Sequence, residues 1–249
     1  MKVHKLTIAL LVLVCATLGL TLGRQSQSQS EIEKGTEYAK QLQARRLRFP
    51  TADYDEPDLP DPKKNEALKE KKLRKNTYKL VARNPPDWQS ESVASNEGEL
   101  DFPALPVAQS AYIVLGKVTS AQAHLSENKK TVYSEFKVSV ERVFKTASSS
   151  ISEGTEIVVD RIGGFVKHPN GRTVLYRISG MNMPLTGERY LLFLTSTNQQ
   201  DLSILTAYEF GVNGTSPLDE WPHFEKYRGV TEGSLVQTLR DSLSKSSPY

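Results

Sequence analysis

The sequence predicts a mainly β protein in which a small antiparallel β-barrel with a C-terminal helix follows an N-terminal hydrophobic helix and a largely unstructured or helical linker. Three observations support this prediction. Short runs of β-branched and aromatic residues, separated by turn residues, follow one another from residue 110 onward. No helical pattern alternates with these runs, which argues against a parallel sheet. The mean hydropathy of −0.44 indicates that part of the 249-residue chain packs no core.

The first 23 residues are typical of an export signal. The short segment Met1–Lys5 is basic, and an uncharged apolar run extends from Leu6 to Gly23. This run is longer than the roughly 7–15 apolar residues of a cleavable signal and close to the ~20 that span a bilayer. Two interpretations stay open: a transmembrane anchor at residues 6–23, or a peptide cleaved near Thr21 and Gly23. Both predict an extracytoplasmic protein, in the periplasm or at the cell surface, that is membrane-anchored or secreted.

Residues 24–109 are predicted to form a polar, charged tether with short helices. Alternating glutamine and serine, followed by an acidic and proline-rich stretch, favour an extended chain. Asp61 and Pro62 then predict the start of a helix that continues to Lys75. Basic residues dominate 63–83, and such a run is either a solvated face or a binding site for an anionic surface polymer.

Residues 110–249 contain the predicted domain. Its first strand covers Ala111–Ser120, where Gly116 favours a bend. Alternating apolar and polar residues over 131–145 predict a second strand that forms a hairpin with the first. The central strand is Tyr190–Leu194, because five consecutive apolar residues require burial. The remaining strands are expected at 156–160, 165–167, 173–178 and 202–212, with an Asn-Gly turn at 170–171 and a closing helix at 231–243.

Such a set of strands favours a closed or nearly closed barrel, since closure leaves no sheet edge exposed. An OB-like barrel is the first expectation, and a sandwich is the second. The only cysteine of the chain is Cys15, so the exported part forms no disulfide and its stability must come from burial.

Three segments of this domain carry a resemblance: Ala111–Val118, Phe136–Lys145 and Gly187–Leu194. They resemble uncharacterised exported bacterial proteins and, more distantly, the netrin-like domain of the OB fold, which includes tissue inhibitors of metalloproteases. The resemblance covers residues 110–194 and implies an exported OB-like barrel. In those inhibitors a disulfide-tied amino-terminal cysteine addresses the metal of the protease. No inhibitory residue carries over, because residues 110–249 contain no cysteine.

The sequence contains no signature of catalysis or of a cofactor site. It has no Gly-x-Ser-x-Gly, no phosphate-binding loop and no His-Glu-x-x-His spacing. The histidines of the exported part, His124, His168 and His223, lie far apart in the sequence. We therefore expect no catalytic residue, no cofactor and no metal site.

The first interpretation of function is a non-enzymatic, membrane-tethered module that binds a protein or an anionic surface polymer. Its oligomeric state is left open. The candidate partner-binding residues lie on the barrel face and in the loops from residue 161 to residue 183: Arg161, Phe165, His168, Arg172, Met181 and Met183.

Two alternatives belong to other classes. One is an extracytoplasmic hydrolase whose acid and base are found among Asp160, Glu209 and Asp219. The other is a nucleic-acid-binding OB fold, which requires exposed aromatic residues interleaved with basic ones. Phe136 and Tyr176 are the main candidates for such stacking, and the scarcity of others argues against nucleic acid.

Overall fold

The computed structural model describes residues 48–77, 91–94, 102–147, 151–197 and 201–246. The predicted membrane segment at 6–23 and the tether before Arg48 lie outside these ranges. No helix among the described residues is long and apolar enough to cross a membrane. The described residues belong to one compact unit that begins at Arg48.

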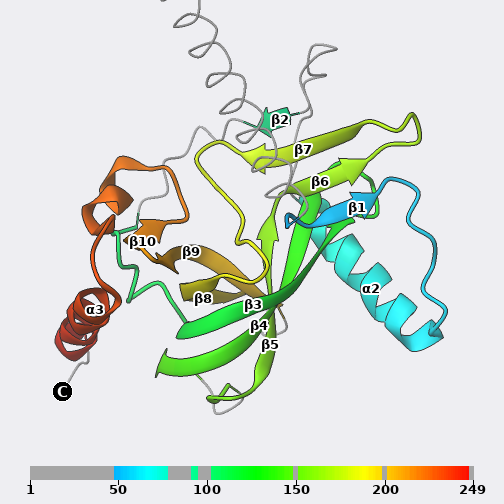
Figure 1. Cartoon of the computed structure of the whole chain (residues 1–249). Coiled ribbons are helices and arrows are strands. Elements are labelled where there is room, and N and C mark those ends of the chain that lie inside the picture. Colours follow the sequence, from blue (N-terminus) through cyan, green and yellow to red (C-terminus); the bar gives the residue numbers. More distant parts are fainter. Residues whose placement is uncertain (1–47, 78–90, 95–101, 148–150, 198–200, 247–249) are drawn as a thin grey trace, which may run out of the picture. The chain divides into compact units, whose positions relative to one another are not determined.

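The compact unit is mainly β, with a largely antiparallel six-stranded sheet and a C-terminal helix (Figure 1). In spatial order the sheet contains β10 (Gly214–Pro217), β9 (Asp201–Gly211), β5 (Glu156–Ile162), β4 (Val132–Lys145), β3 (Tyr112–Leu125) and β8 (Arg189–Thr197). Strand β9 also pairs with β8 and, over a short parallel stretch, with β5. Each of the strands β3, β4, β5, β8 and β9 therefore has a hydrogen-bonded neighbour on both sides.

A second sheet contains four short strands. Their order is β1 (Thr51–Asp53), β6 (Gly164–Lys167), β7 (Thr173–Ile178) and β2 (Glu91–Ala94). Strands β6 and β7 pair antiparallel, which confirms the hairpin that the Asn-Gly turn predicted. The turn needs glycine because Gly171 has φ of +80°. Strands β1 and β2 each pair in parallel with the hairpin and come from the segment predicted to be a tether.

The central strand is apolar throughout because both of its faces are buried. Leu192 and Leu194 pack into the core between the strands, whereas Leu191 and Phe193 pack into a second apolar cluster under the C-terminal helix. This helix, α3 (Glu232–Ser246), contributes Leu235 and other apolar residues to the second cluster. A short 3₁₀ helix, η2 (Pro222–Tyr227), precedes it. The predicted closing helix is thus confirmed.

The predicted bend of the first strand falls where β4 comes very close. The pairing of β3 with β4 shifts register between Leu115 and Gly116. A Cβ atom added to Gly116 would lie 2.6 Å from Cγ1 of Val138 and 2.7 Å from the carbonyl oxygen of Ser139. Glycine is therefore required here by the close approach of the neighbouring strand.

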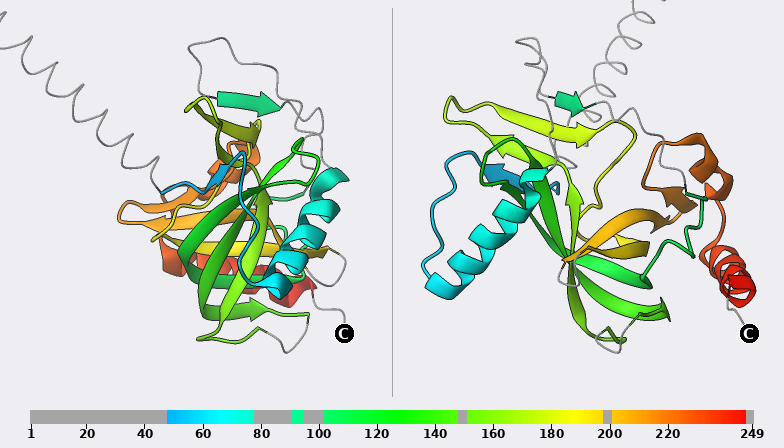
Figure 2. Two further views of the ribbon diagram at one scale, coloured as in Figure 1. Left: turned by 90° about the vertical axis from the view of Figure 1, so that its right-hand side faces the viewer. Right: turned by 180° about the vertical axis from the view of Figure 1, so that it is seen from behind.

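The compact unit begins at Arg48, earlier than residue 110, where the sequence placed the start of the domain. Helix α2 (Pro62–Arg74) and the turn η1 (Lys75–Thr77) belong to this unit, and α2 lies on the opposite side from α3 (Figure 2). The helix starts as predicted, since the Asp61 side chain accepts hydrogen bonds from two backbone N–H groups of the first turn. Charged residues, and not an apolar stripe, attach this segment to the strands, so its sequence pattern is that of a solvated tether.

Candidate functional site

A groove of about 700 Å³ lies beside α2. Helix α2, the loop before it and strands β3 and β4 line this groove. Its apolar lining residues are Pro57, Leu59, Pro60, Ala67 and Leu68. Its polar lining residues include Lys71, Gln122, His124 and Glu135. The groove thus combines an apolar wall with a few polar groups, as ligand-binding grooves commonly do.

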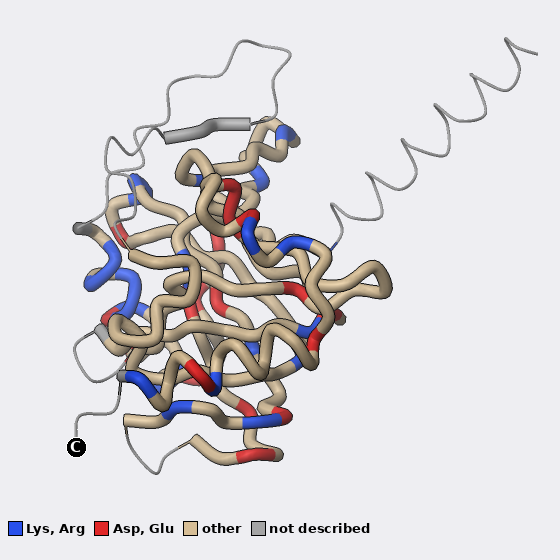
Figure 3. Tube along the Cα trace, turned by 90° about the vertical axis from the view of Figure 1, so that its left-hand side faces the viewer, with Lys and Arg blue, Asp and Glu red and all other residues tan. Residues whose placement is uncertain are grey.

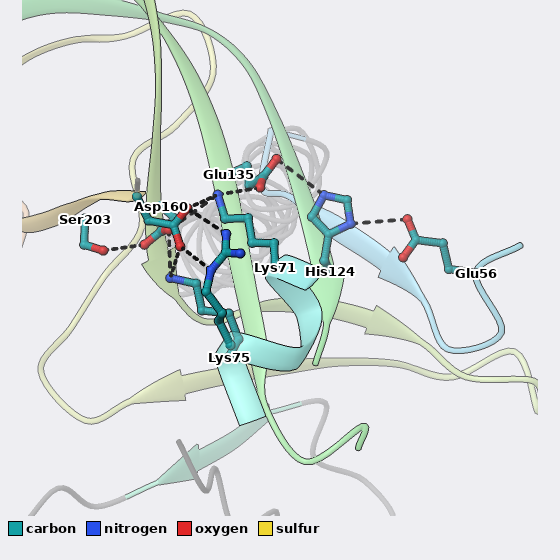
Figure 4. Close-up of polar contacts among 9 residues, drawn as sticks. Glu56, Lys71, Lys75, His124, Glu135, Asp160 and Ser203 are labelled. Atoms are coloured by element: carbon teal, nitrogen blue, oxygen red, sulfur yellow. Dashed lines mark hydrogen bonds and ion pairs between the residues drawn. The ribbon is translucent and has the colours of Figure 1, made fainter. Parts of the chain in front are cut away.

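Charged side chains attach α2 to the strands beneath it (Figure 4). The Nζ atom of Lys71 lies 2.7 Å from Oε1 of Glu135 and 3.6 Å from Oδ2 of Asp160. The Nζ atom of Lys75 lies 2.8 Å from Oδ2 of Asp160. The Ser203 hydroxyl donates a hydrogen bond of 2.6 Å to the other oxygen of Asp160. Asp160 is therefore held from both sides.

The end of α2 is also paired with β9. Arg74 Nη2 lies 3.3 Å from Oδ1 of Asp201, and the ammonium groups of Lys71 and Lys75 lie 3.7 and 3.9 Å from the same carboxylate. Glu135, Asp160 and Asp201 come from β4, β5 and β9, and we call them the acidic patch. The helix presents its basic last turn to this patch, an arrangement that also suits the negative end of the helix dipole.

His124 of β3 lies between two carboxylates. Its side chain is buried, with Nδ1 3.3 Å from Oε1 of Glu56 and Nε2 3.8 Å from Oε2 of Glu135. Lys72 Nζ lies 2.7 Å from Oε2 of Glu56. Burial alone would raise the pKa of Glu56, but the hydrogen bonds and charges of His124 and Lys72 outweigh burial and lower it. Glu56 is therefore an anion at neutral pH.

The surroundings of Lys71 and Tyr133 keep the first charged and the second neutral. Burial would lower the pKa of Lys71, yet the hydrogen bond to Glu135 and the charges of the acidic patch raise it. Burial raises the pKa of Tyr133, and the nearby carboxylates raise it further. Lys75 Nζ lies 5.8 Å from the centre of the Tyr133 ring. The site is therefore an array of matched charges next to an aromatic ring, in which Lys71, Arg74 and Lys75 supply the cations.

Three of the six predicted partner-binding residues are buried. Arg161, Phe165 and Met183 are only 2%, 5% and 4% exposed. Arg161 forms an ion pair with Asp219, and Phe165 packs edge-to-face against Phe49 at 5.7 Å. These side chains stabilise the interior, so a partner would not touch them without a change in the fold. Arg161 lies in β5 and Phe165 in β6, and their burial depends on residues far away in the chain, such as Asp219 and Phe49, which no local pattern indicates.

The other three predicted residues lie outside the groove. His168 is half-buried, with its ring stacked on Tyr54 at 5.2 Å and its Nε2 atom 3.1 Å from the Tyr176 hydroxyl. Arg172 is exposed near the hairpin turn, and Met181 is half-buried. None of the three lines the groove beside α2.

The carboxylates considered for a hydrolase each have a different partner. Asp160 faces Lys71 and Lys75, and Asp219 pairs with Arg161. Glu209 accepts a hydrogen bond of 2.9 Å from the Tyr190 hydroxyl. Within the described parts of the chain, no group of three or more His, Cys, Asp or Glu residues is arranged to hold a metal ion.

The two aromatic residues considered for base stacking are not on an open sheet face. Phe136 is fully buried in the core between the strands. Tyr176 is half-buried, and its hydroxyl group is hydrogen-bonded to His168. Neither side chain is arranged as the exposed stacking platform that single-stranded nucleic acid requires.

The groove and the acidic patch were missed from the sequence. Asp160 follows directly on three apolar residues of a predicted strand, Ile157–Val159, and Lys71 of α2 is followed four residues later by Lys75. A carboxylate in a strand and a basic helix face are separate local signals, and nothing local shows that they meet.

No protein family matches this chain, and a search of curated proteins finds no match. The resemblance to netrin-like domains therefore stays a prediction. The function has to be argued from the site, because a fold alone does not define one.

Proposed function

We propose that this protein is an exported, membrane-tethered, non-enzymatic binding module whose OB-like barrel binds a partner protein in the groove beside α2. The ring of pairings among β3, β4, β5, β9 and β8 agrees with the five strands of an OB barrel. Residues 6–23 supply the anchor in this proposal.

The observation that carries the proposal is the composition of the groove. Its wall is formed by prolines and leucines, and Leu59 is 39% exposed there. Glu135 uses Oε1 for Lys71, whereas its Oε2 atom has His124 Nε2 at 3.8 Å, which is longer than a hydrogen bond. An extended segment of a partner with apolar side chains and one basic residue would fit, because the basic residue could donate to Glu135 Oε2.

A protein partner is favoured over an anionic polymer. Several lysines and arginines of the basic run are already paired within the chain: Lys69 with Asp58, Lys72 with Glu56, and Arg74 with Asp201. On the side that bears α3, opposite α2, basic and acidic residues are interspersed along the chain (Figure 3). The ion pairs of Lys69, Lys72 and Arg74 reduce the positive charge that a polyanion would need.

Site-specific crosslinking in cells tests the proposal. A photoreactive residue is placed at Ala67 in the groove or at Val212, which is fully exposed between β9 and β10. We expect one reproducible protein adduct from position 67 in the membrane fraction and none from position 212. Leu59→Asp should abolish the adduct, and Val212→Asp should leave it intact. Adducts of the same kind from both positions, or no adduct at position 67, would refute groove binding.

A further inference from the structure

Helix α2 has no buried side chain along Pro62–Arg74, in contrast to α3. Its Leu73 is 57% exposed, whereas Leu235 and Leu239 of α3 are fully buried. The attachment of α2 to the strands therefore depends on ion pairs, above all those of Lys71 and Lys75. These two lysines are four residues apart and so lie on the same side of the helical segment.

We propose that residues 62–77, which we call the strap, form a displaceable cover of the acidic patch, and that a basic helical segment of a partner protein binds the patch when the strap leaves. The inference goes beyond the proposed function and does not require the groove. The strap itself shows the chemistry that the patch accepts: two ammonium groups one helical turn apart, with a guanidinium between them in the sequence.

The acidic patch requires a cation at all times. The side chains of Asp160 and Asp201 are only 5% and 12% exposed, and both lie within 4 Å of Lys75 Nζ. Buried carboxylates without a counter-charge are strongly disfavoured. Loss of the strap into solvent is therefore costly, whereas exchange of the strap for another basic segment preserves the pairing. The patch should accept a partner by exchange.

The Tyr133 ring gives a second reason for a cationic occupant. It lies under Lys75, and its pKa is raised by burial and by the acidic patch, so the ring stays neutral. A neutral aromatic ring next to three carboxylates attracts an ammonium group by its quadrupole and by their charge. An apolar or acidic helix would obtain neither contribution.

A peptide in trans tests the exchange. The probe is a fluorescent peptide with the sequence of residues 61–77, and the matched control peptide carries glutamine at the positions of Lys71 and Lys75. The receptors are the full chain and its Lys71→Gln/Lys75→Gln variant, in which the strap has lost its main contacts. Lys63→Gln/Lys64→Gln is the control variant, since the patch contacts come from Lys71, Arg74 and Lys75, whereas Lys64 Nζ lies 3.9 Å from Oδ2 of Asp61, at the start of the helix.

We expect the peptide to bind the Lys71→Gln/Lys75→Gln variant at least tenfold more tightly than the wild type, because the strap competes in cis at a high effective concentration. The control peptide should bind this variant at least tenfold more weakly than the probe peptide does. The Lys63→Gln/Lys64→Gln variant should behave as the wild type. Equal binding of both peptides, or no binding up to millimolar concentration, would overturn the proposal.

Hydrogen exchange of the wild-type chain decides the question even if the double variant does not fold. Millimolar peptide should increase the exchange of the α2 amides and leave the α3 amides unchanged. No change in α2, or a parallel increase in α3, would overturn the displaceable strap. The Leu59→Asp chain should respond to the peptide as the wild type does, so a failure of groove crosslinking and a failure of strap exchange are distinguishable.

Discussion

Arg161 and Asp219 illustrate how single residues stabilise this protein from inside. Their side chains are 1% and 0% exposed, and Asp219 also accepts a hydrogen bond of 3.2 Å from the backbone N–H of Asn182. A buried ion pair adds little over an apolar pair, but loss of one partner leaves a charge without compensation. The pair therefore connects β5 to the segment after β10 at a high cost of disruption.

Asp219→Asn should lower the free energy of unfolding by about 3–5 kcal/mol, because Arg161 then stays buried without a counter-charge. Urea denaturation measures the loss. Glu225→Gln is the control, since the pair of Glu225 with Arg228 is exposed and should contribute far less. Similar losses in both variants would show that the burial of Arg161 is not decisive.

At the scale of elements, α2 and α3 are attached in different ways. Helix α3 inserts leucines into an apolar cluster, and α2 presents lysines to carboxylates. The two attachments should respond differently to pH, because only the attachment of α2 depends on titrating groups. The pKa values of Glu56 and Lys71 define the pH range in which the groups that attach α2 are charged.

Protection of the α2 amides should be greatest between about pH 5 and 10 and should fall outside this range. The pKa of Glu56 is lowered from 4.5, so its contribution is present above pH 4.5 and is lost as pH falls through the folded-state pKa. The pKa of Lys71 is raised from 10.5, so its contribution is present below pH 10.5 and is lost as pH rises through the folded-state pKa.

Hydrogen exchange of α2 relative to α3, after correction for the intrinsic rate at each pH, measures this profile. Glu56→Gln should reduce the loss of α2 protection at low pH, and Lys71→Gln should reduce the loss of α2 protection at high pH. If α2 and α3 lost protection together at every pH, α2 would not be held separately by charge.

At the scale of the whole molecule, the compact unit depends on its first part. β1 pairs with β6, and the strap covers the acidic patch. A chain that begins at residue 110 would leave the acidic patch without its cations. The carboxylates would then repel one another in a partly buried position.

A chain of residues 48–249 should unfold in one cooperative transition, whereas residues 110–249 should unfold at a clearly lower temperature. Thermal circular dichroism measures both. Glu135→Gln/Asp160→Asn/Asp201→Asn should raise the melting temperature of the shorter chain and lower that of the longer chain, where it removes the partners of the strap. Equal stability of the two unmodified chains would contradict the boundary at Arg48.

Several elements follow from local sequence because their causes are local. The alternation of Phe136, Val138 and Val140 with polar residues defines β4, and Asp61 with Pro62 defines the start of α2. Strands β1, β2 and β10 were not predicted, since three or four residues that pair through their backbone carry no pattern of their own. For the same reason, the sequence does not show that residues 48–77, expected to be part of a tether, belong to the folded unit.

The sequence by itself determined the mainly β class, the principal strands, the C-terminal helix and the start of α2, because periodicity, turns and caps act over a few residues. Only the tertiary structure decided that Lys71 and Lys75 meet Glu135, Asp160 and Asp201. It also decided that Arg161, Phe165 and Met183 are buried. Ion pairing and burial depend on residues far apart in the chain, and no local pattern records which of them the fold brings together.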